Sequence, residues 1–219
     1  MKLAKHSKLV MMGDSITDCG RKRPIGDGNE GWGNGYVNLV VSHLAAEWPE
    51  YVTHVISMGT SGDTVRSLKA RWQTDCLDLK PDWVSIMIGI NDVWRQFDRP
   101  YQKGAGVPLP EYTETLEELI VKTKSTLSGG LILMTPFYIE PLKTDEMRKC
   151  MDEFGAAVKS LALKHKTIFV DTQAAFDKTL QHTYSASIAK DRVHPVTTGH
   201  TILANAFLRG IGAMSVNRE

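Results

Sequence analysis

The sequence predicts one α/β domain over residues 1–219, a three-layer α/β/α arrangement with a central, mostly parallel sheet of five strands. Two patterns support this prediction. Short apolar runs, each the length of a buried strand, alternate with longer amphipathic segments along the whole chain. Because strands that alternate with helices need crossover connections, helices are expected on both faces of the sheet. A chain of 219 residues, 42% of them hydrophobic, is long enough for one sizeable core.

Each element can be placed in order. The expected strands are the five short apolar runs Lys8–Met12, Val52–Met58, Trp83–Ile88, Leu131–Met134 and Thr167–Val170. The expected helices are the longer segments Tyr36–Glu47, Glu111–Thr126, Met147–His165 and Thr198–Ile211. Two stretches rich in glycine or proline, Cys19–Gly35 and Gln96–Pro110, are expected to be long loops. Ligands of open α/β sheets bind beyond the carboxyl ends of the strands, where such loops emerge.

Composition narrows the possible partners and location. A net charge of +1 offers no broad basic field for nucleic acid. The cysteines Cys19, Cys76 and Cys150 are too few and scattered for a disulfide framework, and none forms a zinc-binding pair, so a reducing cytoplasm is expected. The sequence shows neither a secretory signal nor an apolar run of about 18 residues, and we therefore expect no membrane partner.

The first polar motif, GDSITD at 13–18, follows the first expected strand. Gly13 permits a tight exit from the strand, and Ser15 would be held at the rim of the sheet among backbone N–H groups. That position suits a nucleophile, with Asp14 supporting the loop rather than reacting. The alternative is that Asp14, Ser15 and Asp18 are ordinary turn formers and a helix cap.

The last motif, DRVHP at 191–195, supplies a base and its orienting group. Pro195 stops the segment from continuing as helix, and a single turn brings the Asp191 carboxylate to the His194 imidazole. An isolated Asp-x-x-His is more often a surface ion pair. His200, within the last expected helix, is a competing base, although packing or capping there is the simpler interpretation.

Donors for an oxyanion are expected at the ends of the second and third strands. Asn91, in the GIND motif at 89–92, offers a neutral side-chain amide. The Gly59 N–H is a second candidate beside the Ser15 N–H, and the alternative for these positions is ordinary turn chemistry. Nucleophile, oriented base and oxyanion donors at successive strand ends predict ester hydrolysis through a serine, which needs no metal or cofactor.

This set of motifs resembles the SGNH, or GDSL-type, esterase and lipase superfamily, whose blocks occur here in order over essentially the whole chain. The resemblance implies the SGNH-hydrolase, flavodoxin-like fold. It also implies that Ser15, Asp191 and His194 form the catalytic triad, and that Ser15, Gly59 and Asn91 form the oxyanion hole. One departure is Ser57, where many relatives have asparagine; that position is supporting rather than catalytic.

Longer stretches, GDSITDCG at 13–20, PDWVSIMIGINDVWR at 81–95, MTPFYIE at 134–140 and FVDTQAAF at 169–176, resemble the intracellular acetylxylan esterases of this superfamily. Those enzymes remove acetyl groups from xylo-oligosaccharides during xylan degradation. The resemblance therefore implies a small acetylated saccharide as substrate, a cytoplasmic location and a homo-oligomer.

Side chains near the expected strand ends are candidates for sugar contacts: Trp32, Trp94, Arg95 and Tyr138. No long apolar groove segment is visible, which favours a small acyl group.

Two other functions remain as alternatives, and a third fails on its number of metal ligands. The chain could be a lipolytic or thioesterase-type hydrolase of other short acyl esters, or a non-catalytic carbohydrate-binding protein on the same fold. A two-metal phosphoesterase could be drawn from one set of acids and histidines, but its ligand count fails: Asp14, Asp18, Asp92, His194 and His200.

Overall fold

The computed structural model describes residues 1–28 and 30–215. Within them lies a five-stranded parallel sheet in the order β2-β1-β3-β4-β5. The strands are β1 (Lys8–Gly13), β2 (His54–Gly59), β3 (Trp83–Met87), β4 (Gly130–Met134) and β5 (Ile168–Val170). The five predicted strands are confirmed, with ends that shift by at most two residues. Central strands bury nearly every side chain because helices cover both faces.

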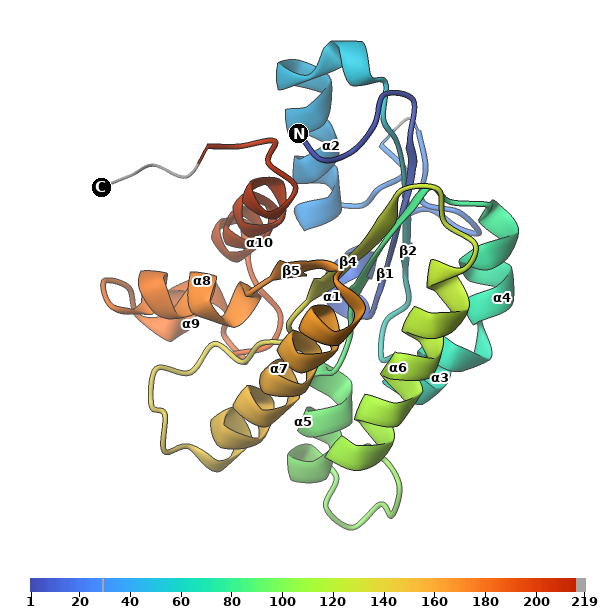
Figure 1. The fold of residues 1–219 in the computed structure, drawn as a ribbon. Helices are drawn as coiled ribbons and strands as arrows, with labels where there is room; N and C mark the ends of the chain where they lie inside the picture. Colours follow the sequence, from blue (N-terminus) through green and yellow to red (C-terminus); the bar gives the residue numbers. More distant parts are fainter. Residues whose placement is uncertain (29, 216–219) are drawn as a thin grey trace.

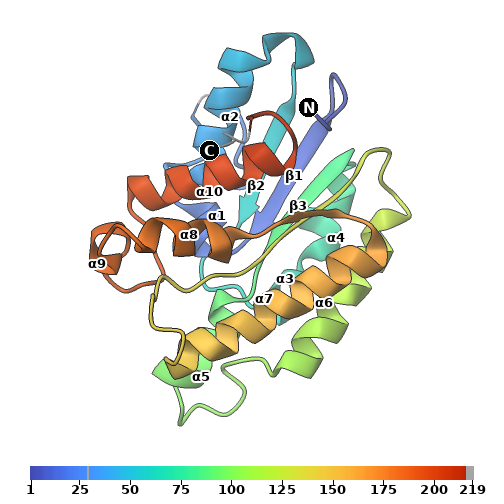
Figure 2. The ribbon, with the colours of Figure 1, turned by 60° about the vertical axis from the view of Figure 1, so that its left-hand side comes forward.

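Helices form the outer two layers (Figure 1). One layer holds α2 (Tyr36–Glu47), α8 (Thr172–Leu180) and α10 (Thr197–Gly210), and the other holds α3 (Val65–Ala70), α4 (Trp72–Asp75), α6 (Leu109–Lys124) and α7 (Glu146–His165). The turned view shows α10 crossing in front of α2 on one side of the sheet, with α6 and α7 side by side on the other (Figure 2). The three-layer prediction is therefore confirmed.

Short elements at the strand ends complete the chain. They are the helices α1 (Ser15–Asp18), α5 (Ile90–Asp98) and α9 (Ser185–Ile188), and the 3₁₀ turns η1 (Pro49–Tyr51) and η2 (Leu77–Leu79). The expected loop 96–110 is shorter than predicted, because α5 continues to Asp98 and α6 already begins at Leu109. Proline is compatible with the first turn of a helix, where its missing N–H has no intrahelical partner, so Pro110 does not delay α6.

In the described part of the chain no helix has the length and apolar character needed to cross a membrane. Across the same residues, no three histidine, cysteine or acidic side chains gather as a possible metal site.

Candidate active site

Ser15 stands at the carboxyl end of β1, as the first residue of α1. The turn before it needs glycine, because a Cβ at Gly13 would lie 2.2 Å from the Thr17 hydroxyl oxygen and 2.7 Å from the Met87 carbonyl oxygen. Asp14 caps α1 by accepting a hydrogen bond from the Ile16 N–H at 3.0 Å. The Ser15 N–H lies in the first turn of the helix, where backbone N–H groups have no intrahelical acceptor. Among the described residues it has no other acceptor, so it can donate to a ligand.

His194 lies against Ser15, although 179 residues separate them in the chain. Its Nε2 is 3.0 Å from the Ser15 hydroxyl oxygen, and its Nδ1 is 2.7 Å from Oδ2 of Asp191. A carboxylate can only accept, so the proton sits on Nδ1 and Nε2 is left to accept the serine proton. These contacts are the ones expected of a base that a carboxylate orients, as the DRVHP motif predicts.

Asp191 also organises the loop that carries the base. Its Oδ1 accepts from the backbone N–H groups of Val193 at 3.0 Å and His194 at 2.8 Å. Burial alone would raise its pKa, but the hydrogen bonds from His194 and Val193 outweigh burial and hold the pKa of Asp191 below its usual value. Asp191 is therefore ionised at neutral pH and stabilises the imidazolium that forms when His194 takes a proton.

Asn91 lies in the first turn of α5, directly after β3, and is only 2% exposed. Its Nδ2 donates to the Asp63 carbonyl at 3.0 Å, which leaves the second hydrogen of the amide for another acceptor. Its Oδ1 accepts from the Arg95 guanidinium at 3.2 Å. The side-chain amide is thus held at the carboxyl end of the sheet before any charge develops there.

Gly59 is placed differently from the prediction that it donates to the oxyanion. It is buried beneath α1: a Cβ there would lie 2.1 Å from the Asp18 nitrogen and 2.5 Å from the Thr17 carbonyl carbon. On the outer edge of β2, Ser57 exchanges backbone hydrogen bonds with Gly26 at 2.7 and 3.2 Å. Because N–H groups alternate sides along a strand, the Gly59 N–H also faces this edge, away from β1 and Ser15. The absence of a side chain at Gly59 lets α1 pack directly on β2.

Gly62 lies in the turn that follows β2, next to the residue that Asn91 contacts. The Asp63 N–H donates to the Thr60 carbonyl at 3.2 Å, and Gly62 has φ +86°, as at the third residue of a type II turn. Among the described residues, the Gly62 N–H has no hydrogen-bond acceptor. Its turn adjoins Asn91 through the Asp63 carbonyl. The signal in the sequence was a glycine at the third position of this turn, where a positive φ favours glycine, and the prediction overlooked it.

Comparisons with known proteins agree with this geometry. The model of the GDSL-like lipase/acylhydrolase family matches residues 11–202. The chain belongs to this family. It is 55% identical over 213 residues to an acetylxylan esterase of Geobacillus stearothermophilus, covering 97% of both chains. The chain is therefore a carboxylic ester hydrolase.

Solved structures of related enzymes have the same fold. The crystal structure of Axe2, an acetylxylan esterase from Geobacillus stearothermophilus, superposes with a TM-score of 0.96 at 53% identity over 100% of both chains. LAE5, an alpha/beta hydrolase enzyme from the metagenome of Lake Arreo, Spain, matches with a TM-score of 0.96 at 48% identity over 99% of this chain and 100% of LAE5. Structures described as catalytic mutants of Axe2 carry the changes S15A, D191A and H194A. Their residue types and numbers coincide with Ser15, Asp191 and His194 of this GDSL-like hydrolase.

His200 is not the base in this GDSL-like hydrolase. Its Nδ1 accepts from the Tyr36 backbone N–H at 3.2 Å, so the proton sits on Nε2, which lies 3.5 Å from the sulfur of Cys19. Burial lowers its pKa to about 4, with a smaller contribution from His194. It is a neutral packing residue between α10, α2 and the end of α1, as the simpler interpretation held.

Two of the four candidate sugar contacts lie beside the triad. The Trp94 ring meets the His194 ring edge-on with centroids 5.7 Å apart, and the Arg95 guanidinium lies 4.6 Å from the centroid of Trp94. Trp32 points elsewhere, because its indole N–H donates to the Val55 carbonyl at 2.7 Å. Val55 precedes Gly59 on β2 by four residues, or roughly 13 Å of strand, so the contacts of Trp32 do not bring it to Ser15.

Tyr138 does not offer a face for stacking. Only 6% of it is exposed, and the Arg192 guanidinium lies over its ring at 5.4 Å. Arg192 also pairs with the Glu140 carboxylate, and its carbonyl accepts from the Ile139 N–H at 2.9 Å. The segment after β4 therefore holds the loop between Asp191 and His194, and Arg192 of that loop lies over Tyr138. The low exposure of Tyr138 does not favour the predicted sugar contact.

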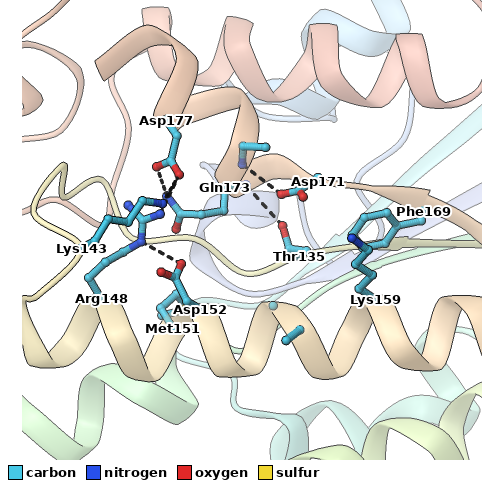
Figure 3. Close-up of a pocket in the computed structure, with 13 residues that line it drawn as sticks. Thr135, Lys143, Arg148, Met151, Asp152, Lys159, Phe169, Asp171, Gln173 and Asp177 are labelled. Atoms are coloured by element: carbon cyan, nitrogen blue, oxygen red, sulfur yellow. Dashed lines mark hydrogen bonds and ion pairs between the residues drawn. The ribbon is translucent and has the colours of Figure 1, made fainter. Parts of the chain in front are cut away.

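A pocket lies between α7 and α8, and Figure 3 shows the charged side chains that line it. Arg148 is fully buried there, and its guanidinium donates to Asp152 at 2.8 Å, to Asp177 at 2.7 Å and to the Glu140 carbonyl at 2.6 Å. These donors are committed to the protein, so Arg148 holds the 138–140 segment to α7 and α8 rather than offering a ligand site.

Proposed function

We propose that this chain is a serine carbohydrate esterase that removes acetyl groups from xylo-oligosaccharides or related acetylated sugars through an acetyl-Ser15 intermediate. The observation that carries this proposal is the continuous chain of contacts from Ser15 Oγ through His194 to Asp191. The 55% identity to an acetylxylan esterase supports the sugar ester as substrate. The substrate is a small acetylated saccharide, and the chemistry needs no cofactor.

In the first half-reaction, the Ser15 oxygen attacks the acetyl carbonyl carbon while His194 Nε2 takes the hydroxyl proton. The carbonyl π electrons move to its oxygen, and the tetrahedral intermediate collapses as His194 protonates the departing sugar oxygen. In the second half-reaction, His194 removes a proton from water, which attacks the acetyl-Ser15 carbonyl. Acetate leaves, and the proton returns to Ser15.

The negative charge of each tetrahedral intermediate needs donors already in place. The Ser15 N–H at the start of α1 and the Asn91 side-chain amide at the end of β3 supply two of them. The Gly62 N–H, unpaired in the neighbouring turn, is the third in this proposal and replaces the predicted Gly59. Asp14 caps α1 and so holds Ser15 in place.

We also propose a cytoplasmic, homo-oligomeric enzyme without nucleic acid or membrane partners. The cysteines Cys19, Cys76 and Cys150 are all free thiols, which suits a reducing compartment. Phe97, at the end of α5, is 42% exposed, and Tyr101, in the loop that follows, is 98% exposed. Two exposed aromatic side chains so close in the chain suit a contact between copies. Light scattering coupled to size exclusion chromatography tests the oligomer: a monomer at assay concentration would contradict it.

The test of the function compares p-nitrophenyl acetate, butyrate and octanoate with peracetylated xylobiose, for the wild type and Ser15→Ala, with EDTA present. We expect strong preference for acetyl esters, release of acetate from the sugar, and loss of turnover in Ser15→Ala with an unchanged melting temperature. A preference for octanoate would keep the serine chemistry and move the substrate to lipids or thioesters. Ester hydrolysis that survives Ser15→Ala would overturn the assignment.

A further inference from the structure

One face of α5 carries side chains that touch both halves of the proposed catalytic machinery. Asn91, Trp94, Arg95 and Asp98 lie at positions i, i+3, i+4 and i+7 of this helix, which places them on the same side. Asn91 is the proposed oxyanion donor, and Trp94 meets the ring of the base, His194. Arg95 sits between them and is the residue whose contacts link the others.

The Arg95 guanidinium makes three contacts along this face. One terminal nitrogen donates to Oδ1 of Asn91 at 3.2 Å, and the other pairs with the Asp98 carboxylate. Its plane lies over the Trp94 ring at 4.6 Å. The side chain is 18% exposed, so these contacts are partly shielded from water. Arginine is suited to this use because its rigid planar fork donates and stacks at the same time.

The geometry points to Arg95 as a positioning residue that sets the orientation of the Asn91 amide toward the oxyanion, an inference that rests on the proposed esterase function. Arginine has only donors, so the amide oxygen of Asn91 must face it. The Asp63 carbonyl can only accept, so the amide nitrogen must face the opposite way. Both partners select the same one of the two possible amide orientations.

A cationic donor on Oδ1 also strengthens the N–H groups of the same amide. Hydrogen bonds in a chain polarise one another, and a charged donor polarises more than a neutral one. Through Arg95, the Asn91 N–H that faces the substrate becomes a better donor to a developing oxyanion. Asp98 and Trp94 keep the guanidinium in place, so no reorganisation is needed when charge appears.

This role differs from the direct sugar contact that the sequence suggests for Arg95. A residue that binds sugar hydroxyls acts only on sugar esters and acts mainly on KM. A residue that prepares the oxyanion hole acts on every ester, including p-nitrophenyl acetate, and acts mainly on kcat. Its effect also requires Asn91, because it works through that side chain.

The experiment is a double-mutant cycle between Arg95→Met and Asn91→Ala, assayed on p-nitrophenyl acetate and on peracetylated xylobiose. Methionine keeps much of the apolar stem and removes the donors. We expect Arg95→Met to lower kcat about tenfold on both substrates with KM nearly unchanged, a fraction of the loss for removing an oxyanion donor. In the Asn91→Ala background, the same change should alter kcat by less than about twofold, as expected for residues that act as one unit.

Controls separate this role from a structural one. Arg99→Met alters an exposed arginine just beyond α5 and should leave kcat unchanged on both substrates. Arg95→Lys, which retains a donor but not the fork, should recover part of the loss, and it serves for the cycle if Arg95→Met does not fold.

The inference would be overturned by a loss confined to the sugar substrate, by a change in KM alone, or by an equal loss with and without Asn91. None of these results affects the proposed function, which depends separately on the Ser15→Ala comparison.

Discussion

Asp191 binds His194 twice, through the ring Nδ1 at 2.7 Å and through the backbone N–H at 2.8 Å. One carboxylate oxygen therefore sets the tautomer of the base, while the other folds the loop that carries it. The loop needs this support because both side chains are more than 40% exposed. Orientation of the base is thus built into a four-residue segment rather than supplied by a distant element.

Asp191→Asn separates the two tasks. Its amide oxygen can keep accepting from the backbone N–H groups of Val193 and His194, while its NH₂ faces Nδ1 and forces the proton onto Nε2. We expect kcat for p-nitrophenyl acetate to fall by about 10³–10⁴ from the wrong tautomer, as in other serine triads. The melting temperature should stay near that of the wild type.

Asp191→Ala is the matched comparison, because it removes the loop hydrogen bonds as well. It should lose similar activity and also lower the melting temperature. If Asp191→Asn kept more than a tenth of the wild-type kcat, the role of Asp191 in setting the tautomer would be wrong.

Gly59→Ala tests the packing role of this glycine. The new methyl group would meet backbone atoms of Thr17 and Asp18, which are not free to move as a flexible side chain is. We expect the free energy of unfolding to fall by about 2 kcal/mol or more through overpacking, and kcat to fall as α1 and Ser15 shift. Urea denaturation and the esterase assay measure both effects.

Gly155→Ala is the control for Gly59→Ala. At Gly155, within α7, the nearest atom to a new Cβ is 3.8 Å away, an ordinary contact. This change should raise the free energy of unfolding by about 0.5–1 kcal/mol through helix propensity. If Gly59→Ala left the free energy of unfolding unchanged, α1 would not pack tightly against β2 at this position.

The fold and the pairing of Asp191 with His194 were predictable because their signals are local. Apolar runs gave every strand, and the DRVHP motif holds the base and its orienting group within one turn. Gly62, which we propose for the oxyanion hole in place of Gly59, was not predictable in the same way. Which edge of β2 the Gly59 N–H faces depends on its pairing with neighbouring strands and with Gly26, and the φ of Gly62 depends on a turn. Both are properties of the folded chain.

The sugar contacts were the least predictable part of the candidate site. Tyr138 follows a strand, as a binding aromatic would, but Arg192 covers its ring from a position 54 residues later. Trp32 lies within a glycine-rich loop, yet its indole N–H donates to the amino-terminal half of β2. The sequence predicts where an aromatic residue lies along the sheet. Whether its ring is exposed depends on segments that are distant in sequence.

Arg148→Met tests the buried ion cluster of Figure 3. The change leaves Asp152 and the Glu140 carbonyl without their partner and leaves Asp177 with weaker ones. The Asp152 and Asp177 side chains stay 39% and 27% exposed, so water can solvate the carboxylates that lose their partner. We therefore expect a loss of about 1–3 kcal/mol in urea denaturation at pH 7, mainly from the hydrogen bonds that Arg148 donates.

Lys149→Met is its matched control. The neighbouring lysine is half exposed and, within the described part of the chain, pairs with Glu146 of the same helix alone, so its removal should cost less than about 0.5 kcal/mol. If both variants lost the same small amount, the Arg148 cluster would not anchor the 138–140 segment.

The buried Asp92 makes stability depend on pH. Its Oδ1 accepts from the Val65 N–H at 2.9 Å, whereas among the described residues its Oδ2 has no hydrogen-bond partner. Burial raises its pKa to about 7, far above the value of an unfolded aspartate. Between about pH 4 and pH 7 the folded protein therefore holds a proton that the unfolded chain has released.

This difference in bound protons decides whether stability rises or falls with pH. Because the folded state binds more protons in this window, the free energy of unfolding falls as the pH rises from 4 to 7 and then levels off. Asp92→Asn removes the titration, keeps the bond to Val65 and replaces the unpaired oxygen with an amide. We expect it to be more stable than the wild type by roughly 2–4 kcal/mol at pH 8, with little difference at pH 4.

Urea denaturation at pH 4, 5, 6, 7 and 8 measures this difference between the two proteins. Burial also raises the pKa of Asp14 to about 7, which makes the free energy of unfolding fall with pH in both proteins. The difference between the two curves therefore reports the effect of Asp92. Asp78→Asn, at an exposed position, should run parallel to the wild type at every pH. If the Asp92→Asn curve also ran parallel to it, Asp92 would be ionised throughout, and its unpaired oxygen would not be the source of the pH dependence.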